Sequence, residues 1–463
     1  MVNWMFSVIA PPHRAPTANP TPGNPAKDGA PSSGCGAQNR LPKSDAKQSR
    51  PDLATLTALR FVAALWVVFF HLQAMQHTFL APVYELFRPI IANGDLGVDV
   101  FFVLSGFIIT YTYLDRLGPR FSWRASADFV WARFARMWPA FALVVGVLGL
   151  WLVYGSAQES VREWSLQTES PDLSPWGLAK QLLMMHLWFQ PGTDGASWFG
   201  PGWTVSAEWL AYLAFPLLAL VLFRLRRLHP LAALAASVLV LLPTAVWGPD
   251  LPIATDEHQP YDWLLRIACC FIAGAFACIA ARNADRMKFN AALAGPGALL
   301  TGTAVVVFLA TAGKPGPGRL AVLAFPLLIA LLSLTRGWLR SALSARWLQY
   351  GGHSSYSLYL VHMFFIYLFY WLIRDWPNGA GPVAENELGV ACLLGIALAT
   401  HLLYKYVEEP ARLRLRALVP KVGAAKPGRD AVREPQPREL RNAMVSAATW
   451  SGHSHKTRCP TPG

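Results

Sequence analysis

Residues 56–72 read LTALRFVAALWVVFFHL, an almost uninterrupted apolar run that carries two ionisable side chains, Arg60 and His71. With its continuation to residue 78, the run has the roughly 20 mostly apolar residues that a membrane-spanning helix needs. A charge near the middle of such a helix costs at least about 2.5 kcal/mol, so both side chains require an explanation. Because they are eleven positions apart, they project from one helix face, about 16 Å apart along the axis.

Each of these side chains has a structural explanation beside a functional one. Arg60 lies near the start of the run, where it could anchor the helix by reaching the membrane surface. His71 could simply be satisfied by a polar group of a neighbouring helix. The sequence around the pair leaves both explanations open.

Nine further apolar runs follow along the chain. Apolar residues make up 54% of the sequence and charged residues only 14%, whereas a soluble domain is about 25% charged. The positive mean hydropathy and the 19 tryptophans also favour a membrane protein. We therefore predict an all-α integral membrane protein with about ten transmembrane helices in one bundle. The ten predicted spans are residues 56–78, 96–114, 137–154, 203–223, 231–248, 263–281, 289–311, 320–335, 354–374 and 388–407.

The distribution of positive charge predicts which loops face the cytoplasm. Arginine and lysine gather in alternate loops, after the second, fourth, sixth and eighth spans, and in both tails. Cytoplasmic loops carry this excess of positive charge, so we predict that both termini are cytoplasmic. The net charge of +13 is therefore explained by membrane topology, and nucleic-acid binding is not expected.

Composition divides the chain into three parts. Residues 1–52 are rich in Pro, Gly, Ser and Ala, and residues 411–463 are basic and rich in Pro; both are predicted to be disordered cytoplasmic tails. Residues 53–410 form the predicted membrane domain. Within it, residues 178–190 are apolar but only about half a crossing long, which predicts a re-entrant or interfacial element on the outer side.

Two acidic residues are placed by this topology at the depth of His71. Asp99 and Glu208 each lie about one turn inside the outer end of their spans. A carboxylate beside an imidazole fixes its tautomer and raises its basicity, as a general base acting on a hydroxyl requires. We therefore predict that His71, Asp99 and Glu208 form a catalytic group in the outer half of the membrane.

Three further side chains are weaker candidates for this site. His362 lies near the middle of the ninth span, and it is as well explained by packing between helices as by function. The other two candidates are Ser206 and Tyr359.

Arginines predict a separate site at the cytoplasmic side. Arg133 and Arg136 precede Pro139 and share a helix face at positions i and i+3. Together with Arg60 they would form a cationic mouth suited to phosphate groups. The alternative is an ordinary positively charged loop. The six cysteines show neither metal nor disulfide spacing, so no metal site is expected.

Seven segments of the chain resemble motifs of the acyltransferase-3 family of bacterial membrane proteins, in the family's order. The family acylates O-antigens of lipopolysaccharide, exopolysaccharides, glucans and some small glycosides. The segments are residues 56–72, 97–107 (GVDVFFVLSGF), 133–139 (RFARMWP), 200–216 (GPGWTVSAEWLAYLAFP), 266–274 (RIACCFIAG), 354–362 (SSYSLYLVH) and 404–410 (YKYVEEP).

The resemblance implies a multi-pass enzyme of the bacterial cytoplasmic (inner) membrane. It implies acyl-CoA as a donor substrate that enters from the cytoplasm, and a carbohydrate or glycolipid acceptor on the outer side. By motif position, Arg60, Arg133 and Arg136 would serve the donor, and His71, Glu208 and Asp99 the chemistry. Gly202 and Thr204 stand where a bulkier apolar residue and Ser are more usual, so a different acceptor pocket is implied. The short tail implies that a fused extracytoplasmic hydrolase-like domain, found in some relatives, is absent.

These observations predict an O-acyltransferase that moves an acyl group, with acetyl expected, from acyl-CoA to a carbohydrate hydroxyl. No tightly bound cofactor is expected, and membrane lipid is the other expected partner. A transporter or flippase that uses the buried charges to bind substrate or relay protons is the alternative. A sensor or scaffold without catalysis is a third possibility.

Overall fold

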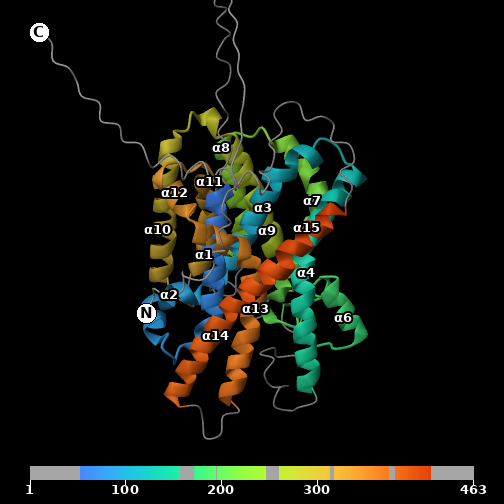
Figure 1. Cartoon of the computed structure of the whole chain (residues 1–463). Helices are drawn as coiled ribbons and strands as arrows, with labels where there is room; N and C mark the ends of the chain where they lie inside the picture. Colours follow the sequence, from blue (N-terminus) through green and yellow to red (C-terminus); the bar gives the residue numbers. More distant parts are fainter. Residues whose placement is uncertain are drawn as a thin grey trace, which may run out of the picture. The chain divides into compact units, whose positions relative to one another are not determined.

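The computed structural model describes residues 53–156, 171–193, 196–246, 260–312, 317–374 and 381–418, and every regular element in these ranges is helical (Figure 1). Within them, nine helical segments are long and apolar enough to cross a membrane. These nine coincide with nine of the ten predicted spans. The remaining span forms α8, Pro230–Val246, an apolar helix of 17 residues that is shorter than the others. The all-α membrane fold is therefore confirmed.

The spanning helices share their chain order with the predicted spans and are joined by shorter helices. Their bounds are α1 Leu53–His71, α3 Leu96–Leu117, α4 Trp123–Ser156, α7 Trp203–Leu225, α9 Asp262–Arg282, α10 Ala294–Ala312, α11 Phe325–Leu334, α13 Arg346–Arg374 and α14 Pro382–Leu402. The shorter helices are α2 Ala81–Ala92, α6 Pro175–Leu182, α12 Trp338–Leu343 and α15 Glu409–Ala417.

The eighth predicted span reaches its length in an unusual way. The 3-10 helix Pro317–Ala324 leads directly into α11. A 3-10 helix rises about 2.0 Å per residue, against about 1.5 Å for an α-helix. Eight residues of the first kind and ten of the second therefore extend about 31 Å, close to the roughly 30 Å of a bilayer core.

Close contacts fix the relative directions of the central helices. Gly352 of α13 lies against Thr57 of α1, and His362 lies against His71, so these two helices run parallel. In α3, Gly97 lies against Ala63 and Val67 of α1, while Gly94, just before α3, lies against Phe70 and Trp66, so α3 runs antiparallel to α1. This is what the alternation of the first, second and ninth crossings requires. The cytoplasmic position of both termini stays a prediction.

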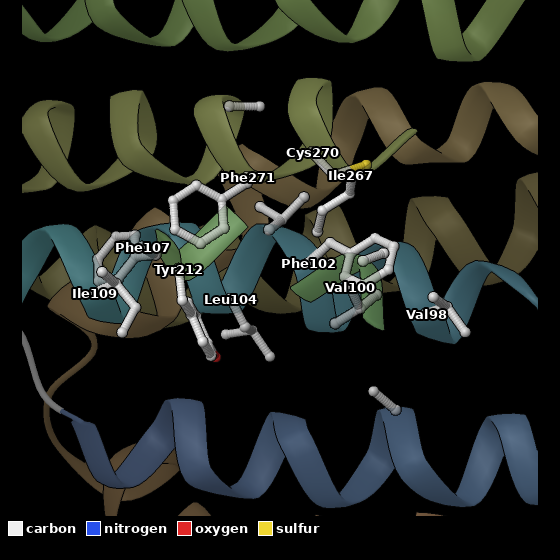
Figure 2. Close-up of a cluster of buried hydrophobic side chains, with 14 of the residues drawn as sticks. Val98, Val100, Phe102, Leu104, Phe107, Ile109, Tyr212, Ile267, Cys270 and Phe271 are labelled. Carbon is white, nitrogen blue, oxygen red and sulfur yellow. The ribbon is translucent and has the colours of Figure 1, made fainter. Parts of the chain in front are cut away.

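The helices α3 and α9 form the most deeply buried part of the bundle, and Figure 2 shows the side chains that fill their interface. Glycines allow this close approach. A methyl group on Gly106 would lie 1.9 Å from the backbone oxygen of Phe271, and one on Gly274 would lie 1.9 Å from that of Val103. In lipid the hydrophobic effect does not drive helices together. Tight association depends on close packing, which small residues allow. By contrast, α10 and α14 lie at the edge of the bundle (Figure 1).

The predicted half-crossing at residues 178–190 is a short helix followed by turns. The helix α6 ends at Leu182, and its last carbonyl accepts a hydrogen bond from Trp138 Nε1 of α4 at 2.9 Å. A 3-10 turn, Gly200–Gly202, then leads into α7. The element is thus too short to cross a bilayer, as the sequence predicts, and the structure also shows that it is bonded to α4. Its position on the outer side stays a prediction.

The C-terminal boundary predicted at residue 410 differs from the structure. A π-helical segment, Leu403–Glu408, continues α14 into α15, which ends at Ala417. Pro410 does not end the helical structure, because it lies in the first turn of α15, where a missing N–H group is tolerated. The remaining C-terminal residues and the predicted N-terminal tail lie outside the described residues, so the predicted tails stay predictions.

Candidate functional site

A pocket lined by both polar and apolar side chains lies between α1, α3, α4, α7 and α13, and all three predicted arginines line it. Arg60, Arg133 and Arg136 line it together with the carboxylate of Glu208 and the hydroxyl of Tyr359. Its cavity volume is about 100 Å³. The predicted cationic cluster is therefore present as one wall of a cavity.

Each of the three arginines has a different environment. Arg133 donates a hydrogen bond from Nη2 to Tyr113 Oη at 3.1 Å, and its guanidinium carbon lies 5.3 Å from the centre of the Tyr113 ring. Arg136 pairs with the buried carboxylate of Glu408. Arg60 makes no hydrogen bond or ion pair with any described residue. Arg60 and Arg133 thus keep donors available to a ligand, while Arg136 is already neutralised.

The pocket is elongated along α3. Its lining residues on α3 extend from Val98 to Ile109, a distance of about 16 Å at 1.5 Å per residue. Arg133 lies at the Ile109 end, because it contacts Tyr113 one turn further on. Phe101, near the other end, contacts the ring of Tyr359. The pocket therefore has an arginine end and a Tyr359 end.

Glu208 lies between these two ends. Its Oε1 atom accepts a hydrogen bond from Ser105 Oγ at 2.6 Å and another from the hydroxyl of Tyr212. The two hydroxyl oxygens lie 2.9 Å apart. Three side chains from α3 and α7 thus form one hydrogen-bonded group in the wall of the pocket.

Tyr359 closes the far end. Its hydroxyl donates to the backbone oxygen of Pro201 at 3.0 Å and accepts from Thr204 Oγ1 at 2.8 Å. Its ring centre lies 5.7 Å from that of His362, which belongs to the next turn of α13. Tyr359 therefore stands between the pocket and a pair of histidines.

The histidine pair consists of His71 and His362. Their rings lie 5.1 Å apart, and His362 Nε2 is 3.3 Å from His71 Nδ1. His71 Nδ1 is also 2.9 Å from the backbone oxygen of Val67, and His362 Nδ1 is 3.3 Å from that of Leu358. The sequence predicts both histidines as candidates, and the structure brings them together.

One assignment of protons satisfies all three of these contacts. A backbone oxygen can only accept a hydrogen bond, so the Nδ1 atom that contacts it carries the proton in both histidines. His362 Nε2 then accepts from the shared Nδ1–H of His71. Under this assignment the Nε2 atom of His71 is unprotonated and has a free lone pair. It has no hydrogen-bond partner among the described residues, and it is not fully enclosed. Such a nitrogen can act as a base or as a nucleophile.

The prediction that His71 contacts Asp99 and Glu208 is wrong, because both carboxylates are bonded to other residues. Asp99 is held by Arg266 of α9, whose Nε and Nη2 atoms donate to its two oxygens at 2.6 and 2.9 Å. Glu208 is held by Ser105 and Tyr212. The hydrogen-bonding partners of His71 are a backbone oxygen and His362. The depths were predicted, but depth does not determine which neighbour a side chain faces.

The candidate Ser206 also lies outside the pocket. Its hydroxyl donates to the backbone oxygen of Met184 at 2.8 Å, and its backbone oxygen accepts from Trp188 Nε1 at 3.2 Å. These bonds hold the turn after α6 against α7. A structural role explains Ser206 fully.

Sequence reasoning missed several residues of the site. Glu408 is almost completely buried, and it binds Arg136 and accepts from Ser357 Oγ at 2.5 Å. It lies on the π-helical segment, an irregularity that is frequent at functional sites. Tyr212, one turn after Glu208, is the second omission. The regular i, i+4 spacing of Glu208 and Tyr212 was the available signal.

The described part of the chain contains no set of side chains suited to bind a metal ion. No group of three or more His, Cys, Asp or Glu side chains there could hold a metal ion. The cysteines of the described ranges are buried free thiols: Cys269, Cys270, Cys278 and Cys392.

These features define a class of protein: a multi-pass, all-α membrane protein in which a cationic pocket adjoins a histidine pair. Sequence comparison identifies the family. The chain belongs to the acyltransferase-3 family, because the family's model, described as an acyltransferase domain, matches residues 53–403. It is also 27% identical over 402 residues to Acyltransferase MdmB of Streptomyces mycarofaciens, an alignment that covers 82% of this chain and 96% of that protein. No solved structure matches the chain. The protein is therefore an acyltransferase.

Proposed function

We propose that the protein transfers an acyl group, with acetyl expected, from cytoplasmic acyl-CoA to a hydroxyl of a cell-envelope or exported carbohydrate. One observation carries the proposal: a single pocket lined by three arginines extends to Tyr359, and the histidine pair lies directly behind that side chain. A donor with phosphates at one end and a thioester at the other matches that polarity. The protein would act in the bacterial cytoplasmic membrane.

The arginine end would hold the phosphates of the donor. Arg60 and Arg133 line the pocket and have guanidinium N–H groups that no hydrogen bond within the described residues uses, and Arg bonds phosphate oxygens through two N–H groups at once. Arg133 is further oriented by the aromatic rings of Tyr113, Phe129 and Tyr212. Arg136 would contribute less charge, since Glu408 already pairs with it.

In this proposal His71 carries out the acyl-transfer step, either as a base or as a nucleophile. As a base, its Nε2 atom takes the proton of the acceptor hydroxyl, whose oxygen then attacks the thioester carbonyl carbon. The C–S bond breaks, and the CoA thiolate takes up a proton. As a nucleophile, the same nitrogen would first attack the thioester carbon, and the C–S bond would break with CoA leaving as the thiolate. In a second step the acceptor hydroxyl would take the acyl group from the nitrogen, and its proton would pass to the thiolate. In both routes His362 accepts the Nδ1–H bond of His71 and stabilises the positive charge that develops on that ring.

Asp99 has a different part in this proposal from the one that the sequence suggested. Its carboxylate is fully engaged by Arg266. We therefore assign it the role of fastening α3 to α9, and with it the wall of the pocket. Single and double variants of Asp99 and Arg266 separate this role from a catalytic one.

The proposal is tested with purified protein in lipid nanodiscs, acetyl-CoA and carbohydrate extracted from the envelope of a strain that lacks the gene. Release of the CoA thiol and acetylation of the carbohydrate, followed by mass spectrometry, should both depend on acceptor. Arg133→Ala should raise the KM for acetyl-CoA, while Arg120→Ala, an exposed arginine of the adjoining loop, should not. Carbohydrate movement across a vesicle without CoA release would contradict the proposal and favour a transporter.

A further inference from the structure

Glu208 is the one acidic residue among the described residues that line the pocket, and the proposed transfer step does not use it. Two helices place it near the middle of the pocket. On α7 it lies one turn from Thr204, at the Tyr359 end, and one turn from Tyr212, which lies beneath Arg133. On α3 its partner Ser105 lies between Phe101 and Ile109.

The two oxygens of Glu208 differ. Oε1 accepts both hydrogen bonds, from Ser105 and from Tyr212. Oε2 has no partner among the described residues, and it is not one of the fully buried unpaired atoms. The side chain is therefore fixed by one oxygen, while the other remains available in a pocket that it lines.

The chemistry of the pocket limits what Oε2 can bind. An ionised carboxylate only accepts hydrogen bonds, so its ligand must be a donor. No arginine of the described chain pairs with it within 4.0 Å, and no other acidic, cysteine or histidine group joins it to form a metal site. Phosphates would be repelled. What remains is an uncharged N–H or O–H group of the ligand, placed between the arginine end and the thioester end.

We infer that Glu208 Oε2 accepts a hydrogen bond from an amide N–H of the pantetheine arm of acyl-CoA. The inference rests on the proposed function, because it takes acyl-CoA as the ligand of the pocket. The pantetheine arm connects the phosphates to the sulfur and carries two secondary amides, and each has one N–H donor. Ser105 and Tyr212 are positioning residues, since they leave Oε2 directed at the ligand. Glu208 is thus a recognition residue for the middle of the donor.

The test combines protein variants with altered donors. CoA and two CoA analogues, in which one or the other arm amide is replaced by an ester, are titrated into purified protein, and Kd is measured without any acyl transfer. In the wild type, one of the two esters should bind about 10-fold or more weakly, a factor equal to about 1.4 kcal/mol. Glu208→Ala should lose a similar factor for CoA and should no longer distinguish CoA from that ester. Glu387→Gln, which changes an exposed carboxylate of α14, is the control and should behave as the wild type.

Glu208→Gln is the control for a folding defect in Glu208→Ala, because it keeps an acceptor oxygen and the shape of the side chain. It should bind CoA more weakly than the wild type and more tightly than Glu208→Ala. The inference is overturned if the ester penalty persists in Glu208→Ala, or if neither ester binds more weakly to the wild type. It is also overturned if both Glu208 variants bind CoA normally. Failure of the proposed function would look different, since the wild type would then bind CoA and both esters equally poorly.

Discussion

Asp99 and Arg266 allow a catalytic carboxylate to be distinguished from a structural one. Both side chains are buried, and two hydrogen bonds of 2.6 and 2.9 Å join them. Arg266 Nη2 also donates to the backbone oxygen of Asp95 at 2.9 Å. Asp99→Ala would leave the buried guanidinium with only the longer ion pair to Asp95, whose Oδ2 atom lies 4.0 Å from Arg266 Nη2. Removing one partner of a buried ion pair costs about 3–5 kcal/mol, whereas replacing both by apolar residues of similar volume is often nearly neutral.

We therefore expect Asp99→Ala and Arg266→Met each to lower the free energy of unfolding by about 3–5 kcal/mol. The double variant Asp99→Leu/Arg266→Met should be more stable than either single variant and should keep acyl transfer within about 10-fold, a tolerance of 1.4 kcal/mol. Unfolding is followed by titration with a denaturing detergent in mixed micelles, and transfer is measured on the same preparations. A double variant as stable as the wild type but with transfer reduced more than about 100-fold would refute the structural role, because a missing general base costs that much.

Three further predictions concern the histidine pair, the helix interface and the topology. His71→Gln should bind acyl-CoA normally but lose acyl transfer by about 100-fold or more, and His362→Gln, measured in the same transfer assay, should lose less because it acts through His71. Gly106→Val should prevent α3 from approaching α9, since even a methyl group would lie 1.9 Å from a backbone oxygen; the amount of folded protein after size-exclusion chromatography checks this. Reporter enzymes fused after residue 226 should be active on the cytoplasmic side and those fused after residue 255 on the outer side, and the reverse pattern would contradict the topology.

The spanning helices could be predicted because bilayer thickness imposes the same length on every crossing. Each span is a local run of apolar residues, and the alternation of basic loops adds one global constraint. Two differences from the prediction have local causes. The fifth span, α8, has only 17 residues, and the helix at the C-terminus continues past Pro410 because a proline fits the first turn.

The candidate site was predictable only where one helix carried the whole pattern. Arg133 and Arg136 are three residues apart on α4, so their shared face follows from helical periodicity, and both line the pocket. The hydrogen-bonding partner of Asp99 could not be predicted in this way, because it lies on another helix. Its depth followed from α3, but its partner depended on the rotation of α3 against α9, which is set by the glycine contacts between them. Pairing across helices far apart in sequence is not contained in any local pattern.

Two parallel helices, α1 and α13, connect the arginines of the pocket to the histidine pair. On α1, Arg60 and His71 are separated by about 16 Å at 1.5 Å per residue. On α13, which runs in the same direction, Ser357 supports the Glu408–Arg136 pair at the arginine end, while His362 joins His71 five residues further on. Gly352 brings the two helices together, since a methyl group there would lie 2.1 Å from the backbone oxygen of Thr57. A shift of α13 along α1 would therefore separate the two histidines and displace Ser357 from Glu408 at the same time. Under the proposed function, these rigid helices would keep a donor that is bound at the arginines in register with His71.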